Sequence, residues 1–130
     1  MTTAGASGAK APHQSILIIE DDADIRESLQ LALESAGYTI DVAGNGEEGL
    51  RKLQAIDRPA LILLDLMMPI MNGLEFLAAR RADQALASIP VVLVTAYGHL
   101  GDHATDLAGL VRKPIDLDEL LRIVSQYCGP

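Results

Sequence analysis

The sequence has little of several residue types, and each shortage argues against a class of function. Trp is absent and aromatic residues make up 3% of the 130 positions. The core must therefore be aliphatic, and a stacking surface for single-stranded nucleic acid is not expected. Cys128 is the only cysteine, so no internal disulfide can form, and this fits a reducing compartment. The formal net charge of -8 argues against direct binding to nucleic acid or to an anionic membrane.

Long apolar runs are also missing. No stretch is long enough to span a bilayer, and the first residues lack the apolar core of a signal peptide. We therefore expect a cytoplasmic protein that does not enter a membrane. Hydrophobic residues still make up 49% of the chain, which is enough for the core of one domain. Residues 1–14 are small and polar, so we predict a disordered tail before a folded domain over residues 15–128.

Short apolar runs alternate with stretches of helical periodicity. The predicted strands are residues 16–19, 39–43, 61–64, 91–94 and 110–112. The predicted helices are one that ends before Gly37, residues 46–56, residues 73–85, a short helix over 102–108, and one that begins near Asp116. An unbroken apolar run such as 61–64 is typical of a strand buried on both faces. The alternation predicts an α/β fold, a doubly wound parallel sheet with helices on both faces.

Chemically active side chains follow four of the predicted strands. They are Glu20 with Asp21, then Asp65, Thr95 and Lys113. Taken singly, each has a simpler interpretation: an acid at a helix start, a loop aspartate, a terminal strand residue or a solvated charge. In a doubly wound sheet, however, the carboxyl ends of these strands meet at one edge. Clustered acids suit Mg²⁺, and a carboxylate beside a cation, an ammonium and a hydroxyl can accept a phosphoryl group.

The same residues carry a family resemblance. The segments are Ile-Ile-Glu-Asp-Asp at 18–22, Leu-Leu-Asp-Leu-Met-Met-Pro-Ile-Met-Asn-Gly at 63–73, Val-Thr-Ala at 94–96 and Lys-Pro at 113–114. Over about residues 15–127 the chain resembles the CheY-like receiver domain of two-component response regulators, of the single-domain type. The resemblance implies a flavodoxin-like, five-stranded sheet of order 2-1-3-4-5. It also implies a cis peptide bond between Lys113 and Pro114.

The resemblance assigns roles to the residues at the strand ends. Asp65 would be the phosphoacceptor, and Thr95 and Lys113 would contact the phosphoryl group. Mg²⁺, or another divalent cation such as Mn²⁺, would be bound directly by Asp21, Asp65 and the Met67 backbone carbonyl, with Glu20 acting through water. Asp22 falls one place beyond the acidic pair and should begin the first helix.

Two features of the sequence depart from the family and concern signal output. The segment between Thr95 and Lys113 is short, so the helix within it should be abridged. Leu110 occupies the switch position that is usually aromatic.

The resemblance makes Met67 and Tyr97 the positions that tune phosphate lifetime. Neither side chain readily positions an attacking water, so we expect slow self-dephosphorylation.

The resemblance also indicates where a partner would dock. A phosphodonor would contact Asp24, Ile25 and Ser28 at the start of the first helix, together with Pro114 and Ile115 after the last strand. Ile25 could equally belong to the core.

Three functions are compatible with these observations. The leading one is a signalling module, not a classical enzyme, which catalyses only its own Mg²⁺-dependent phosphorylation and dephosphorylation. It would take a phosphoryl group from a histidine kinase or a phosphotransfer protein onto Asp65 and act, as a monomer, through a downstream protein target. The second is a receiver-like interaction domain that works without phosphorylation. The third, a flavin binder of the same topology, is disfavoured because Glu20, Asp21 and Asp22 would repel a phosphate.

Overall fold

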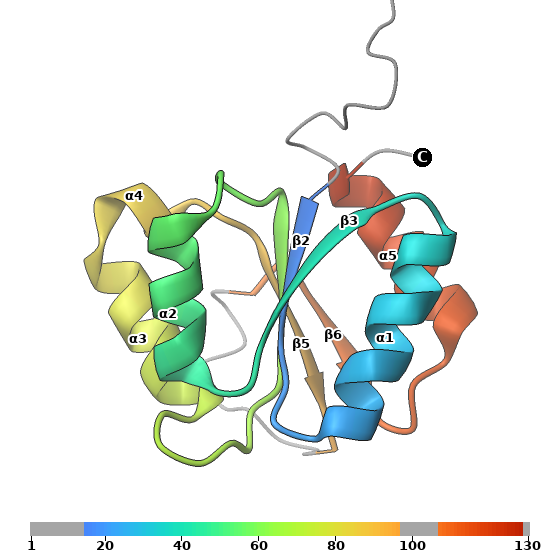
Figure 1. Cartoon of the computed structure of the whole chain (residues 1–130), viewed down its shortest axis with the longest axis horizontal. Helices are drawn as coiled ribbons and strands as arrows, with labels where there is room; N and C mark the ends of the chain where they lie inside the picture. The colour runs from blue at the N-terminus through green and yellow to red at the C-terminus, as the bar shows by residue number, and fades with distance from the viewer. Residues whose placement is uncertain (1–14, 97–106, 129–130) are drawn as a thin grey trace, which may run out of the picture.

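A parallel five-stranded sheet forms the centre of the protein (Figure 1). The structure is a computed structural model that describes residues 15–96 and 107–128. The strands are β2 (Ser15–Ile19), β3 (Thr39–Ala43), β4 (Leu61–Leu64), β5 (Val91–Thr95) and β6 (Gly109–Arg112). They lie in the order β3-β2-β4-β5-β6, and every neighbouring pair is parallel. In chain order this is 2-1-3-4-5, so the predicted fold is confirmed.

Helices cover both faces of the sheet. They are α1 (Ala23–Ser35), α2 (Gly46–Ala55), α3 (Gly73–Ala82), α4 (Gln84–Ala87) and α5 (Leu117–Cys128). Figure 1 shows α1 and α5 on one face, with α2, α3 and α4 on the other. None of the helices within residues 15–96 and 107–128 has the length and apolarity needed to cross a membrane.

The central strands carry unbroken apolar runs, over residues 16–19, 61–64 and 91–94, because both of their faces are buried. Along β2, Ile16 and Ile18 pack into the core on the α1–α5 side, whereas Leu17 and Ile19 pack into the core on the α2–α3 side. Successive strand side chains point to opposite faces, so a strand covered on both sides needs an unbroken apolar run. The polar residues that follow each run therefore stand where the strand leaves the core.

The predicted helix over 73–85 is interrupted at Asp83. This residue has an extended backbone (φ -110°, ψ 112°) and ends α3. Its carboxylate accepts a hydrogen bond from the Ala85 N–H at 2.9 Å and so begins the separate turn α4. The buried Arg80 stabilises this connection, because its guanidinium donates to the carbonyls of Ala87 and Ile89, each at 2.8 Å.

The predicted helix over 102–108 is wrong at its C-terminal end. Leu107 and Ala108 are not helical. The Ala108 N–H donates to the Val91 carbonyl at 2.8 Å, so the backbone has already joined the sheet at this point. The rest of that helix, residues 102–106, lies outside the described residues, as do Tyr97 and the predicted tail over residues 1–14.

Candidate functional site

Three carboxylates meet at the carboxyl edge of the sheet. Glu20 and Asp21 follow β2, and Asp65 follows β4. One oxygen from each lies within 4.8 Å of the other two. The sheet ladder places them there, since the Glu20 N–H donates to the Ala43 carbonyl and the Asp65 N–H to the Ile19 carbonyl. Glu20 is 2% exposed and Asp65 5% exposed, whereas Asp21 is open to solvent.

Lys113 brings a positive charge into this cluster from the far edge of the sheet. Its Nζ lies 2.9 Å from Glu20 Oε1 and 3.6 Å from Asp65 Oδ1. Its backbone N–H donates to the Thr95 carbonyl at 2.9 Å, which extends the pairing of β6 with β5 by one residue. The bond from Lys113 to Pro114 is cis, as the resemblance implied. One ammonium thus faces two buried carboxylates.

The environment changes the proton affinity of both partners in the closest ion pair. Burial raises the pKa of Glu20 to about 7; the hydrogen bond from Lys113 opposes this shift and the charge of Asp65 adds to it. Burial alone would lower the pKa of Lys113, but the hydrogen bond to Glu20 and the charges of Glu20 and Asp65 outweigh it, so the pKa is raised. Lys113 therefore remains charged at neutral pH. A cation beside Glu20 would favour its ionised form.

The backbone holds Asp65 in place. One carboxylate oxygen accepts the Leu66 N–H at 2.8 Å, and the Leu66 carbonyl accepts the Gly73 N–H at 2.9 Å. A Cβ on Gly73 would lie 2.5 Å from the Asp65 carbonyl oxygen, so the start of α3 passes too close to the strand end for any side chain. Asn72 and Glu75 form a reciprocal capping box that fixes this start.

Asp22 does not belong to the carboxylate cluster. Its side chain accepts the N–H groups of Asp24 and Ile25 and caps α1, as predicted. Its own N–H donates to Glu20 Oε2 at 3.2 Å. Two contacts therefore orient the Glu20 carboxylate, one from Asp22 and one from Lys113.

The acids open onto a cavity of about 280 Å³. Thr95 lines it and is 1% exposed, and Met67 lines it from the β4–α3 loop with a side chain that is 57% exposed. Leu110 lies apart from it, half-buried against the core on the α2–α3 side. The structure thus gathers Glu20, Asp21, Asp65, Met67, Thr95 and Lys113 around one space and leaves Leu110 outside it.

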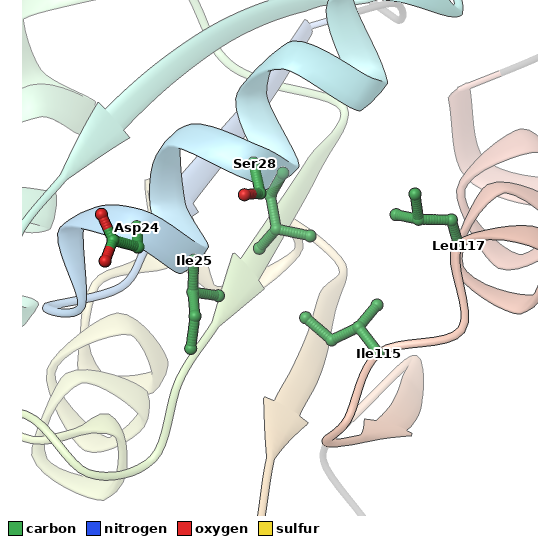
Figure 2. A pocket seen from close by; sticks show the side chains of 6 residues that line it. Asp24, Ile25, Ser28, Ile115 and Leu117 are labelled. Carbon is green, nitrogen blue, oxygen red and sulfur yellow. The ribbon is translucent and has the colours of Figure 1, made fainter.

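A second cavity, of about 320 Å³, lies between the start of α1 and the β6–α5 connection (Figure 2). It is lined by Asp24, Ile25, Ser28, Leu29, Ile115 and Leu117. Four of these were predicted as partner contacts; Leu29 and Leu117 were not, and Pro114 does not line the cavity. The helical spacing of Leu29 predicts a core residue, so the sequence provides no reason to place it in a cavity. Leu117 is 46% exposed, and nothing in the sequence indicates this exposure.

Comparisons with known proteins show which family the chain resembles. The response regulator receiver domain model matches residues 16–125. The chain is 40% identical over 115 residues to response regulator Rre1 of Synechocystis sp., covering 85% of this chain and 49% of that protein. It is 37% identical over 110 residues to response regulator MprA of Mycobacterium ulcerans, covering 82% of this chain and 46% of MprA. The chain thus spans about half the length of these curated relatives.

Solved structures show the same architecture. A response regulator receiver protein from Pseudomonas putida superposes with a TM-score of 0.81 at 29% identity, covering 91% of this chain and 98% of that one. The response regulator protein TrrA from Thermotoga maritima, in complex with Mg²⁺-BeF, superposes with a TM-score of 0.78 at 34% identity, covering 87% and 97%.

Proposed function

The protein belongs to the response regulator receiver domain family, and we propose from this premise that Asp65 accepts a phosphoryl group from a histidine kinase or a phosphotransfer protein. The observation that carries the proposal is the position of Lys113, whose ammonium lies within 3.6 Å of Asp65 at an edge where two further carboxylates converge. A buried carboxylate beside one fixed cation and a cluster of acids is suited to phosphoryl transfer.

The reaction assigns a separate role to each side chain. An Asp65 carboxylate oxygen attacks phosphorus, and the new P–O bond forms as the bond from phosphorus to the imidazole nitrogen of the donor breaks. The Lys113 ammonium offsets negative charge on the phosphoryl oxygens, and the Thr95 hydroxyl donates a hydrogen bond to one of them. Water later attacks phosphorus, which releases inorganic phosphate and restores the carboxylate.

The cluster suits a divalent cation, because its donors are hard oxygen atoms and Glu20 is buried among like charges. Asp21, Asp65 and the Met67 carbonyl would hold Mg²⁺ or Mn²⁺ directly, and Glu20 would act through water. When bound, the cation would neutralise charge on the acids and on the phosphoryl oxygens.

The phosphate on Asp65 should be long-lived. Met67 has no group that positions a water, and we assign the second tuning position to Tyr97, which also lacks a carboxylate or an amide. Leu110 and Pro114 would help to transmit the signal from the phosphorylated site. We propose that the protein acts as a monomer on a downstream protein target.

The second cavity, between the start of α1 and the β6–α5 connection, is the proposed docking surface for the phosphodonor. Ile25, Leu29 and Ile115 offer an apolar depression beside the site, and Asp24 and Ser28 form its polar rim. Ser28→Arg should slow transfer from a phosphorylated phosphotransfer protein and leave transfer from acetyl phosphate unchanged. Equal loss with both donors would indicate a folding defect and contradict the docking assignment.

Intact-mass spectrometry after incubation with acetyl phosphate and Mg²⁺ tests the chemistry. The wild type should gain the mass of one phosphoryl group, Asp65→Asn should gain none, and Asp21→Ala should gain almost none. Asp22→Asn is the matched control, because it changes a neighbouring acid and keeps a good helix cap. An undiminished gain in Asp65→Asn would show that another residue is the acceptor. A wild type that stays unmodified would favour the phosphorylation-independent interaction domain.

A further inference from the structure

Arg26 reaches back from α1 to the strand end that carries the acids. Its Nη1 donates to the main-chain carbonyl of Glu20 at 2.9 Å, across six residues of sequence. That carbonyl stands where the pairing of β2 with β3 ends, since the last bond of the ladder runs from the Glu20 N–H to Ala43. The guanidinium therefore supplies a donor at the point where the sheet no longer does.

This placement runs against the electrostatics of the helix. The first turn of a helix carries a partial positive charge, which favours acids such as Asp22 and Asp24 and disfavours a cation. The half-buried guanidinium is nevertheless confined between two backbone segments. It lies 3.8 Å from the point where a Cβ on Gly44 would stand, in the connection from β3 to α2. The Arg26 guanidinium thus stays at the start of α1, against the helix dipole, through its contacts with the backbone at Glu20 and near Gly44.

Asp21 is the member of the cluster that depends most on its backbone. Lys113 and the Asp22 N–H hold the Glu20 carboxylate, and the Leu66 N–H and Lys113 hold that of Asp65. Among residues 15–96 and 107–128, no hydrogen bond or ion pair orients the exposed Asp21 carboxylate. Its direction follows from the peptide that precedes it, whose carbonyl Arg26 holds.

We infer that Arg26 is a positioning residue for the divalent cation. By anchoring the Glu20 carbonyl it fixes the Glu20–Asp21 peptide plane, and so the direction in which the Asp21 carboxylate leaves the chain. The inference rests on the proposed function, because it requires a cation at the acid cluster. Arg26 bonds to the main chain of Glu20, so it would act as a positioning residue and not as a ligand of the cation.

The charge of Arg26 and its hydrogen bond to Glu20 should have opposite effects on the affinity for a divalent cation, which allows a decisive test. A guanidinium bound to the main chain of Glu20 lies near the acids and repels a divalent cation, so removing its charge should tighten cation binding if charge is all that matters. Loss of the anchor should instead weaken binding, because outer-shell partners of metal ligands typically contribute tenfold or more to affinity. The direction of the change in Arg26→Gln therefore separates the two roles.

The experiment is a Mg²⁺ titration of the ¹⁵N-labelled full chain, followed through the amide signals of Asp21 and Asp65. Arg26→Gln should bind Mg²⁺ about tenfold more weakly than the wild type. Arg122→Gln, which removes an exposed cation from α5, is the control for charge and should bind as the wild type does. Arg26→Lys should fall between them, because its ammonium can still donate to the Glu20 carbonyl but lacks the planar guanidinium that holds this bond in place. If Arg26→Gln does not fold, the comparison rests on Arg26→Lys, and unweakened binding there overturns the inference.

Urea unfolding without metal separates this role from a purely structural one. A structural role would lower the free energy of unfolding in Arg26→Gln and leave its Mg²⁺ affinity at the wild-type value, which would overturn the inference. Binding tighter than that of the wild type would also overturn it. If the wild type itself binds no Mg²⁺, the proposed cation site fails and this inference fails with it. If the wild type binds Mg²⁺ and Arg26→Gln binds it with the same affinity, the inference about Arg26 is refuted and the proposed function is not.

Discussion

Gly73→Ala should disturb Asp65, the proposed phosphoacceptor, because the first residue of α3 presses against the end of β4. An added Cβ would lie 2.5 Å from the Asp65 carbonyl oxygen and 2.8 Å from the Leu66 Cα. Ordinary contact begins at 3.4 Å, so the methyl group and the strand end must separate by about 0.9 Å. Both obstacles are backbone atoms, and no change of side-chain rotamer relieves the clash.

The magnitude follows from two opposing effects. Overpacking of this kind costs about 1–3 kcal/mol, and rigid backbone on both sides puts it at the upper end. Alanine is a better helix former than glycine by up to about 1 kcal/mol, which offsets part of the loss. The net decrease in unfolding free energy should be about 2 kcal/mol. If Asp65 is the nucleophile, as we propose, a displacement of this size should slow phosphorylation by acetyl phosphate on the order of 100-fold.

Gly44→Ala is the matched control. A Cβ there would meet only side-chain atoms at ordinary distances, Glu48 Oε1 at 3.5 Å and Arg26 Nη1 at 3.8 Å. Its stability should stay within about 0.5 kcal/mol of the wild type. Urea unfolding is best followed by circular dichroism, since the chain has no Trp. The reasoning fails if Gly73→Ala matches Gly44→Ala in both stability and phosphorylation rate.

Three further predictions concern pH, backbone strain and one hydrogen bond. Because the pKa of Glu20 is raised from 4.5 to about 7, the folded metal-free protein keeps a proton that the unfolded chain has released, so its stability should fall as the pH rises through this window. Urea unfolding should show a steeper decline in the wild type than in Glu20→Gln, and equal slopes would contradict the burial argument. Ile70 is 75% exposed and has a φ of 68°, so Ile70→Asn should raise the unfolding free energy by about 1 kcal/mol; a loss would show that the turn is unstrained. Tyr127→Phe removes the hydrogen bond to the Ala108 carbonyl and should lower stability by about 1 kcal/mol in the same assay, whereas no change would mean that water replaces it fully.

The sequence alone determined most of the architecture, because local patterns report burial on each face. The runs over β2 and β4 are apolar at consecutive positions since both faces of those strands are covered. Asp22 was recognisable as the start of a helix from its place one residue beyond the acidic pair, and it does cap α1. The four strand-end signals could be combined because parallel topology brings carboxyl ends to one edge.

Only the tertiary structure decided the contacts between distant segments. The pairing of Lys113 with Glu20 spans 93 residues, and the raised pKa of Glu20 follows from burial that no local pattern reports. Asp83 interrupts a helix that periodicity alone would continue, and Ala108 joins the sheet where a helical turn was predicted. Arg26 reads in the sequence as an ordinary helix residue, and its bond to a carbonyl appears only once the chain has folded back on itself. Periodicity records which face of an element is covered, whereas side-chain partners depend on how loops bring separate elements together.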